Sequence, residues 1–189
     1  MSRRHSPRSR RGASALELAL SLPMLLGFML AIIDLGRFIS DTNRATSAAA
    51  AVADLVSQTE SFVDKPNPDT VATGKELGVA NIAAREVATP LKLFTDGVVI
   101  ITVISNDGAG PVVSWVRRWG RTDINSNVST SKMRGIVLVK GEAAVFAEVG
   151  YKFHPFLLSG KLLGLDEDQI FQTTAVRRPR LTGPKLVPA

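Results

Sequence analysis

The 189-residue sequence contains no cysteine and only two histidines. The absence of cysteine excludes disulfide bonds, thiolate zinc sites and cysteine nucleophiles. His5 lies in a basic N-terminal segment and His154 stands beside Pro155, so they do not form a ligand pair with the usual spacing. The acidic run 166–168 lacks the glycine and the spaced ligands of a calcium loop. We therefore expect no metal site, no cofactor and no catalytic residue, and we do not expect an enzyme.

Acidic residues are missing from both ends of the chain. Residues 1–12 hold five arginines, residues 177–189 hold four basic residues, and neither segment contains an acid. The formal net charge of +6 therefore comes from the two ends, because residues 13–176 carry 14 basic and 17 acidic residues. A nucleic-acid-binding domain carries its basic surface on the fold. The charge distribution thus predicts no nucleic-acid partner.

Charge is also scarce in one long segment near the N-terminus. The 21 residues 13–33 contain a single charge, Glu17. A helix of that length spans about 31 Å, which is close to the hydrocarbon thickness of a bilayer. Five arginines precede the segment, and Asp34 and Arg37 follow it. By the positive-inside rule, the sequence predicts a single-pass membrane helix with its N-terminus in the cytoplasm.

Three interpretations of this segment compete. A cleaved secretory signal needs a small-x-small site beyond the apolar run, and residues 32–36 offer a poor one. A plain transmembrane anchor does not explain Glu17 at the bilayer centre, where a carboxylate costs about 2.5–3.5 kcal/mol or more. A glutamate that snorkels to the interface costs less and remains an alternative explanation. The third interpretation is the type IV prepilin signature, in which a basic leader ends in glycine and a glutamate stands at the fifth position after it. Gly12, Ala13 and Glu17 match that arrangement.

The prepilin interpretation explains these features together. Cleavage on the cytoplasmic side after Gly12 would leave Ala13 with a free α-amino group. Two charges that are each costly in a low-dielectric core become tolerable as a hydrogen-bonded pair, so Glu17 of an adjacent subunit could neutralise the amine. Pro23 in the middle of the apolar run predicts a helix kink of the kind that membrane helices accept.

Helical periodicity continues beyond the apolar run. Between residues 41 and 58, apolar residues recur with i, i+3, i+4 and i+7 spacing. The members of this alanine-rich stripe are Ala45, Ala48, Ala49, Val52, Leu55 and Val56. We interpret the stripe as ordinary core packing of a helix that runs from about residue 14 to residue 58 and lies partly in lipid and partly against a globular head.

The remaining sequence predicts a small α+β head with a mostly antiparallel sheet. The expected elements are a second helix over 73–89, strands over 98–105, 112–119, 144–153 and 170–177, a tight turn over 106–111, and a short strand or helix end over 136–139. In the expected second helix, Leu77, Ala80, Ala84 and Val87, with Ile82 beside them, form the apolar side. The sequence therefore divides into a basic leader (1–12), a transmembrane and amphipathic helix (13–58), a head (59–178) and a flexible tail (179–189).

Several of these features resemble the TadE-like proteins (TadE and TadF types) of the tight-adherence, or Flp, pilus system. The resemblance begins with residues 11–17 (RGASALE) and the apolar run carrying Pro23, and continues through residues 34–37 (DLGR). Two later runs agree with the family pattern, namely the W-x-R-x-x-G run over 115–120 and residues 148–155 (EVGYKFHP).

The resemblance implies a minor pseudopilin that initiates, caps or regulates assembly of the pilus. Such a protein would be inserted in the inner membrane with its head on the extracytoplasmic side, and would be cut after Gly12 by a prepilin peptidase. The implied partners are that peptidase, other pilins and pseudopilins, inner-membrane assembly proteins and the lipid bilayer. The alternative function is an unprocessed membrane anchor that carries an extracytoplasmic binding domain.

Overall fold

The computed structural model describes residues 8–67, 71–133, 135–155, 169–179 and 183–189. The chain divides into two units, and the boundary falls at Ile39–Ser40, inside the long N-terminal helix. The first unit contains the N-terminal part of that helix. The second contains the remainder of the helix and the α+β head, and each unit is described by itself below.

Helix α1 runs without interruption from Arg8 to Gln58 and contains Pro23. The helix expected over 13–58 begins earlier than predicted, because residues 8–12 also belong to α1. In the first unit, the large apolar side chains between Leu16 and Ile39 are mostly exposed. An α-helix satisfies its own backbone hydrogen bonds, so these side chains are free to face lipid.

In the second unit, α1 buries the predicted small-residue stripe. The fully buried side chains are Ala45, Ala48, Ala49, Val52, Ala53 and Val56, while Leu55 is partly buried against them. Alanine side chains let the helix backbone approach its neighbours closely, and the burial confirms the predicted core packing. This part of α1 also carries Arg44, which donates to the carbonyl of Thr89, and Asp54, which accepts from Arg177.

Two short helices follow. Helix α2 covers Gly78–Ala88 and α3 covers Leu93–Asp96. The predicted start of the second helix at residue 73 is wrong, because residues 73–76 form a turn held by the Glu76 side chain. The predicted apolar side is also partly wrong: Ile82 and Val87 are exposed, and Ala88 is buried with Ala80 and Ala84.

Four strands form the main sheet, in the order β3-β2-β4-β5 with every neighbouring pair antiparallel. Their bounds are β2 Gly97–Asn106, β3 Pro111–Gly120, β4 Ala143–Phe153 and β5 Gln169–Arg177. These strands confirm the four predicted from β-branched runs. The predicted α+β class with a mostly antiparallel sheet is confirmed as well.

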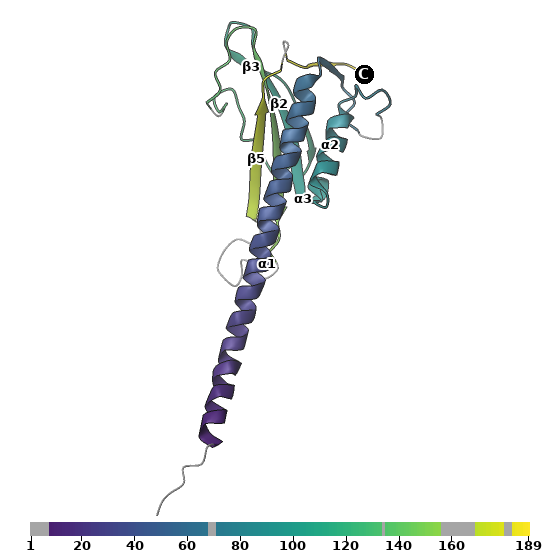
Figure 1. Ribbon diagram of the computed structural model, residues 1–189. Coiled ribbons are helices and arrows are strands. Elements are labelled where there is room, and N and C mark those ends of the chain that lie inside the picture. The colour runs from purple at the N-terminus through teal and green to yellow at the C-terminus, as the bar shows by residue number, and fades with distance from the viewer. Residues whose placement is uncertain (1–7, 68–70, 134, 156–168, 180–182) are drawn as a thin grey trace, which may run out of the picture. The chain divides into compact units, whose positions relative to one another are not determined.

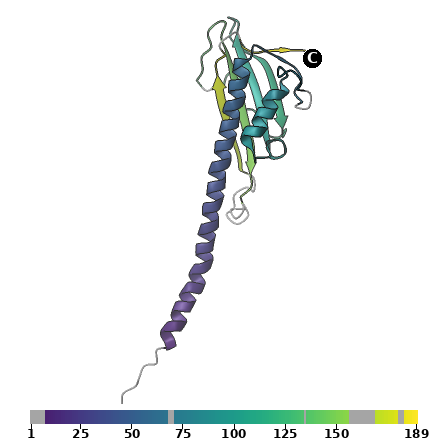
Figure 2. The same ribbon diagram turned by 45° about the vertical axis from the view of Figure 1, so that its right-hand side comes forward.

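Helices cover one face of the sheet and a long connection covers the other. Figures 1 and 2 show α1 and α2 side by side against the sheet, where their buried residues contact alternate residues of β2 and β4 such as Ile101 and Val149. On the opposite face, Val98, Ile100 and Ile104 pack against residues of the segment 121–142. Because both faces are covered, β2 and β4 are buried along almost their whole length.

Strand β3 contains a bulge that changes which side chains share a face. The register shifts between Val103, which pairs with Trp115, and Ile104, which pairs with Val113, so that Ser114 is the extra residue. Strict alternation along the expected strand 112–119 predicts Val113 on the same face as Trp115. That placement is wrong, because Val113 pairs with a residue of the other face and is 43% exposed.

A second, two-stranded sheet joins segments that are far apart in the sequence. Strand β1, Ser61–Val63, pairs in parallel with β6, Lys185–Val187. The expected flexible tail over 179–189 is therefore wrong for residues 185–187. The expected short element over 136–139 is also wrong, because these residues form neither strand nor helix.

The close packing of the small-residue stripe predicts that a larger side chain in the stripe will destabilise the head. Ala49→Leu adds three carbon atoms at a fully buried position, and overpacking of this kind should lower the free energy of unfolding by about 1–3 kcal/mol. Ser47→Leu, on the exposed side of the same helix, is the matched control and should have little effect. Denaturant unfolding of the detergent-solubilised chain measures both. Equal stability of the Ala49→Leu variant and the original chain would contradict the close packing.

Candidate functional site

The proposed processing site lies inside α1. Gly12 and Ala13 follow four helical residues, so the bond between them is part of the helix. The first turn of α1 contains no acidic residue, and Arg8, Arg10 and Arg11 place positive charge at the positive end of the helix dipole. Glycine also weakens a helix by about 1 kcal/mol relative to alanine. The residues before Ala13 therefore have a sequence that does not favour a helix start.

Glu17 lies one turn beyond Ala13 and is exposed. Within the described residues its carboxylate makes no hydrogen bond and no ion pair. Side chains of a helix lean toward its N-terminus. The Glu17 side chain therefore extends toward Ala13. A chain cleaved after Gly12 would carry its α-amino group at that residue.

Pro23 lies in the same exposed part of α1. It lacks the N–H that would bond to the carbonyl of Ala19, so the helix has a weak point there. Two residues before Pro23, the Ser21 hydroxyl donates to the Leu18 carbonyl over 3.2 Å. The kink predicted at Pro23 remains a prediction.

Helix α1 is long and apolar enough to cross a membrane, with its most apolar part near the N-terminus and unburied. The apolar run ends at Asp34, which is 1% exposed and lies 3.7 Å from Arg37. The two residues stand at positions i and i+3 of the helix, a spacing that lets opposite charges interact. They mark the end of the apolar run and the start of a more polar part of α1.

Three side chains of β3 tie the strand to segments outside the main sheet. The indole N–H of Trp115 donates to the carbonyl of Pro184 over 2.8 Å, and that of Trp119 donates to Pro66 over 2.9 Å. Between them, Nε and Nη2 of Arg117 both donate to the carboxylate of Asp64. The W-x-R-x-x-G run thus has a structural role, because its side chains join β3 to other segments of the head. Both indole N–H groups are used in these contacts.

Glycine at the end of that run is required by close backbone approach. Gly120 has φ +97°, and a Cβ there would collide with the carbonyl oxygen of Gly97. On the neighbouring strand, a Cβ at Gly97 would lie 2.5 Å from the carbonyl oxygen of Gly150. These approaches occur where α3 leads into the sheet.

Arginine side chains fix both edge strands of the sheet. Arg117 on β3 pairs with Asp64, and Arg177 on β5 pairs with Asp54 of α1. Each arginine also donates to the carbonyl of the residue before it, Val116 or Val176. The hydrogen bond from Arg117 lowers the pKa of Asp64, and its counterpart raises the pKa of Arg117. Edge backbone groups are thereby partly occupied, which hinders pairing with other chains.

A buried carboxylate anchors the long connection to the outer face of the sheet. Glu148 of β4 is fully buried and accepts hydrogen bonds from the Asn127 N–H (2.8 Å), the Gln172 amide (3.1 Å) and the Ser126 hydroxyl. Three donors compensate for much of the cost of burying a carboxylate. We interpret this cluster as structural.

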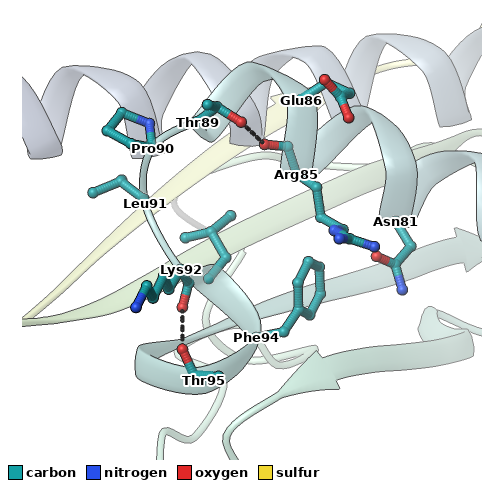
Figure 3. Close-up of a pocket in the computed structure, with 10 residues that line it drawn as sticks. Asn81, Arg85, Glu86, Thr89, Pro90, Leu91, Lys92, Phe94 and Thr95 are labelled. Carbon is teal, nitrogen blue, oxygen red and sulfur yellow. Dashed lines mark hydrogen bonds between the residues drawn. The ribbon is translucent and has the colours of Figure 1, made fainter.

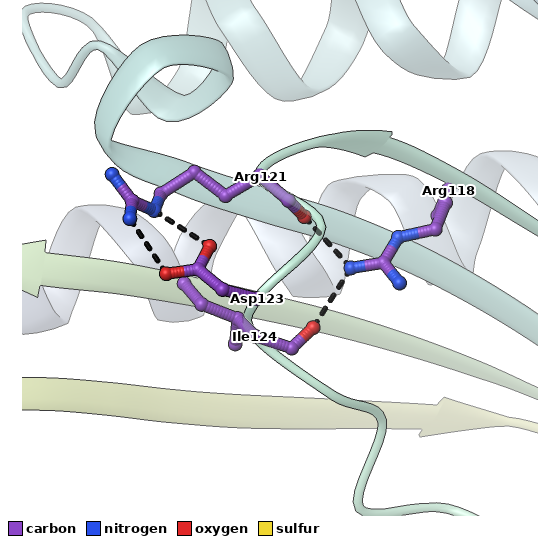
Figure 4. A network of polar contacts seen from close by, with 4 residues as sticks. All are labelled: Arg118, Arg121, Asp123 and Ile124. Atoms are coloured by element: carbon purple, nitrogen blue, oxygen red, sulfur yellow. Dashed lines mark hydrogen bonds and ion pairs between the residues drawn. The ribbon is translucent and has the colours of Figure 1, made fainter.

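The same connection begins with a second polar network, shown in Figure 4. Arg118 donates to the carbonyls of Arg121 (2.7 Å) and Ile124 (2.8 Å), while Arg121 forms a two-pronged pair with Asp123. The hydrogen bonds of Arg121 lower the pKa of Asp123. The network holds Ile124 over Val98 and Ile100 of the sheet.

No metal centre is present among the residues that the structure describes, since no three histidine, aspartate or glutamate side chains gather there. His154 is exposed. The acidic run 166–168 and His5 lie outside the described residues.

Comparison with known proteins bears on the N-terminal segment. The family model of TadE-like proteins matches residues 12–54. This match confirms the resemblance, and it includes Gly12, Glu17 and Pro23. Comparison with curated proteins and with solved structures gave no significant match. The rest of the head, including the W-x-R-x-x-G run, lies beyond the matched segment.

Several polar residues that organise the head were missed by the sequence analysis. Asp54, Asp64 and Glu148 were each found only when the fold brought a distant partner to them. Their local sequence gives no signal, because the partners lie at least 21 residues away.

Glu76 closes the turn that leads into α2. Its carboxylate accepts hydrogen bonds from the Thr73 N–H (3.1 and 3.2 Å) and the Thr73 hydroxyl (3.0 Å). Burial raises the pKa of Glu76, but the hydrogen bonds from its own N–H and from Thr73 and Ala72 outweigh that effect and lower the pKa from 4.5 to about 2. The ionised form is therefore the one that the fold favours.

This shift predicts a loss of stability in acid. Because the folded pKa lies below the ordinary value, the contribution of Glu76 is complete above pH 4.5 and disappears as the pH falls toward 2. Glu76→Gln should reduce the fall in unfolding free energy across that window, whereas Glu60→Gln, at an exposed position, should not. Denaturant unfolding at several pH values measures the effect. An unchanged pH profile in Glu76→Gln would contradict the assignment.

Proposed function

We propose that the chain is a minor pseudopilin-like structural and assembly component of a Tad (Flp) pilus machine. The observation that carries the proposal is the position of Glu17, the fifth residue after Gly12, within an apolar helix whose residues 12–54 match the TadE-like family. A plain anchor has no need of a carboxylate at that position, where its burial in lipid would be costly.

The proposed topology has the N-terminus in the cytoplasm, α1 in the inner membrane and the head on the extracytoplasmic side. Five arginines before the apolar run and none within it support this orientation. The head is free of cysteine and is held together by hydrophobic packing and ion pairs, so it needs no particular redox environment.

Processing would occur between Gly12 and Ala13. The arginine-rich residues before this bond are opposed to the helix dipole and include glycine, which supports local unwinding for a peptidase. Removing residues 1–12 would delete five arginine charges, and the α-amino group of Ala13 would become the N-terminal charge.

Assembly would then use Glu17 as the partner of that amine. In a bundle of such helices, the carboxylate of one subunit would accept a hydrogen bond from the amine of its neighbour, and the pair would be buried as a neutral unit. This arrangement fixes the register between subunits. Pro23, one and a half turns farther along, would let the helices adjust around one another.

Processing is tested at the glycine. Gly12→Val should leave the leader in place, because a branched side chain cannot occupy a site shaped for glycine. Intact mass and N-terminal sequencing of the chain from its own host membranes measure this. Gly27→Ala is the matched control, since a Cβ at Gly27 meets no atom within 4 Å. An original chain that keeps residues 1–12 while an active prepilin peptidase is present would instead favour the unprocessed anchor.

The pairing role is tested at the glutamate. Glu17→Gln should be cleaved normally but should reduce pilus output, because the amine of each neighbour would lose its counter-charge at a cost of about 3–5 kcal/mol. Ser21→Ala, also a polar change on the exposed part of α1, should have little effect. Quantities of sheared pili and of processed protein are compared in the same cells. Normal pilus output with Glu17→Gln would refute the pairing.

A further inference from the structure

The head contains a hollow that the proposed pilus role does not use. It has a volume of about 590 Å³ and lies where α2 ends and the chain turns into α3. Figure 3 shows its lining, which includes Asn81, Arg85, Pro90, Lys92 and Phe94. All of these residues belong to the second unit, so the hollow is formed within a single unit of the chain.

Two cations at this hollow have no carboxylate partner. Arg85 and Lys92 are exposed, and neither forms an ion pair with any residue that the structure describes. The Arg85 guanidinium instead lies 5.9 Å from the ring centre of Phe94, and the two side chains point toward one another in Figure 3. This contact holds the guanidinium at the hollow. Glu86 also lines the wall, so the local formal charge is positive by one.

A buried polar atom at the same hollow also lacks a partner. Asn81 is 5% exposed, and its Oδ1 makes no hydrogen bond with any described residue. Buried amide oxygens are nearly always satisfied, because leaving one unpaired costs free energy. The side chain lines the hollow, so a hydrogen-bond donor that enters there would satisfy it.

We propose that this hollow binds an acidic peptide segment of a partner protein. One side-chain carboxylate of the segment pairs with Arg85, and a nearby peptide N–H donates to Asn81 Oδ1. A second carboxylate of the segment pairs with Lys92, whose side chain points away from Arg85. An adjacent apolar side chain packs on Phe94 and Pro90. The site would operate in an unprocessed anchor as well as in a pseudopilin, so it does not depend on the pilus role.

The chemistry of the wall favours a peptide over a lipid headgroup. Both offer an anion to the two cations. A peptide also supplies an N–H within one residue of its carboxylate. The carboxylate can pair with Arg85, and the N–H can donate to Asn81 Oδ1. The phosphodiester group of a lipid carries acceptor oxygens only, so a donor for Asn81 Oδ1 would have to come from a separate hydroxyl or amine of the headgroup.

The test uses the full chain in nanodiscs of zwitterionic lipid. The probe panel consists of fluorescent acidic peptides in which leucine flanks one to three carboxylates. One member is LGLDEDQI, the sequence of residues 163–170, and its amide counterpart LGLNQNQI is the neutral control. We expect the acidic members to bind with an affinity that falls as salt is raised, and the neutral control to bind about tenfold or more weakly.

Variants assign the binding to the hollow. Arg85→Gln combined with Lys92→Gln should weaken binding by about tenfold or more, whereas Lys140→Gln, at an exposed lysine outside the hollow, should not. Asn81→Leu should weaken binding without changing its salt dependence, and circular dichroism checks that each variant is folded.

Three outcomes would overturn the proposal. The first is that no acidic member of the panel binds at millimolar concentration. The second is that the Arg85 and Lys92 double variant binds as the original chain does. The third is that the original chain captures phosphatidylglycerol vesicles through these two cations but binds no peptide, which would make the hollow a lipid site.

Discussion

Close packing of the alanine stripe of α1 against the sheet is the constraint on which the head depends. Ala45, Ala48, Ala49 and Ala53 are fully buried, and small side chains there let the helix lie close to the buried strands β2 and β4. The same helix exposes leucine, methionine, phenylalanine and isoleucine between residues 16 and 39. One continuous helix thus presents bulky side chains where lipid is expected and small ones where protein covers it.

Features set by local pattern were predictable, whereas features set by distant pairing were not. The β-branched run of β2 and the stripe of α1 have periods that the sequence displays directly. Strands β1 and β6 have only three residues each, and Ser61 pairs with Lys185, so neither run carries a periodic signal. The bulge at Ser114 reversed the face of Val113, because alternation alone does not indicate an inserted residue.

The candidate functional residues also divide into those with a local sequence signal and those whose partners are distant in the sequence. Gly12 and Glu17 are recognisable because their spacing along one helix is itself the signal. The ion pair of Arg117 with Asp64 joins positions 53 residues apart, and the Glu148 cluster joins positions up to 24 residues apart. Such contacts arise only after the sheet has formed. They also explain why the W-x-R-x-x-G run belongs to the head's internal structure: its side chains reach Pro184, Asp64 and Pro66.

The proposed cleavage would change the formal charge of the apolar part of α1. Residues 13–33 carry one negative charge before processing, from Glu17 alone. Under the proposed cleavage, the new amine of Ala13 adds one positive charge at the start of the same segment, and the formal charge of that segment becomes zero. An isolated carboxylate in lipid is costly, but a segment with one amine and one carboxylate can be buried if every such group is paired across subunits. The requirement for pairing would then favour assembled helices over single ones, and the leader would prevent assembly until it is removed.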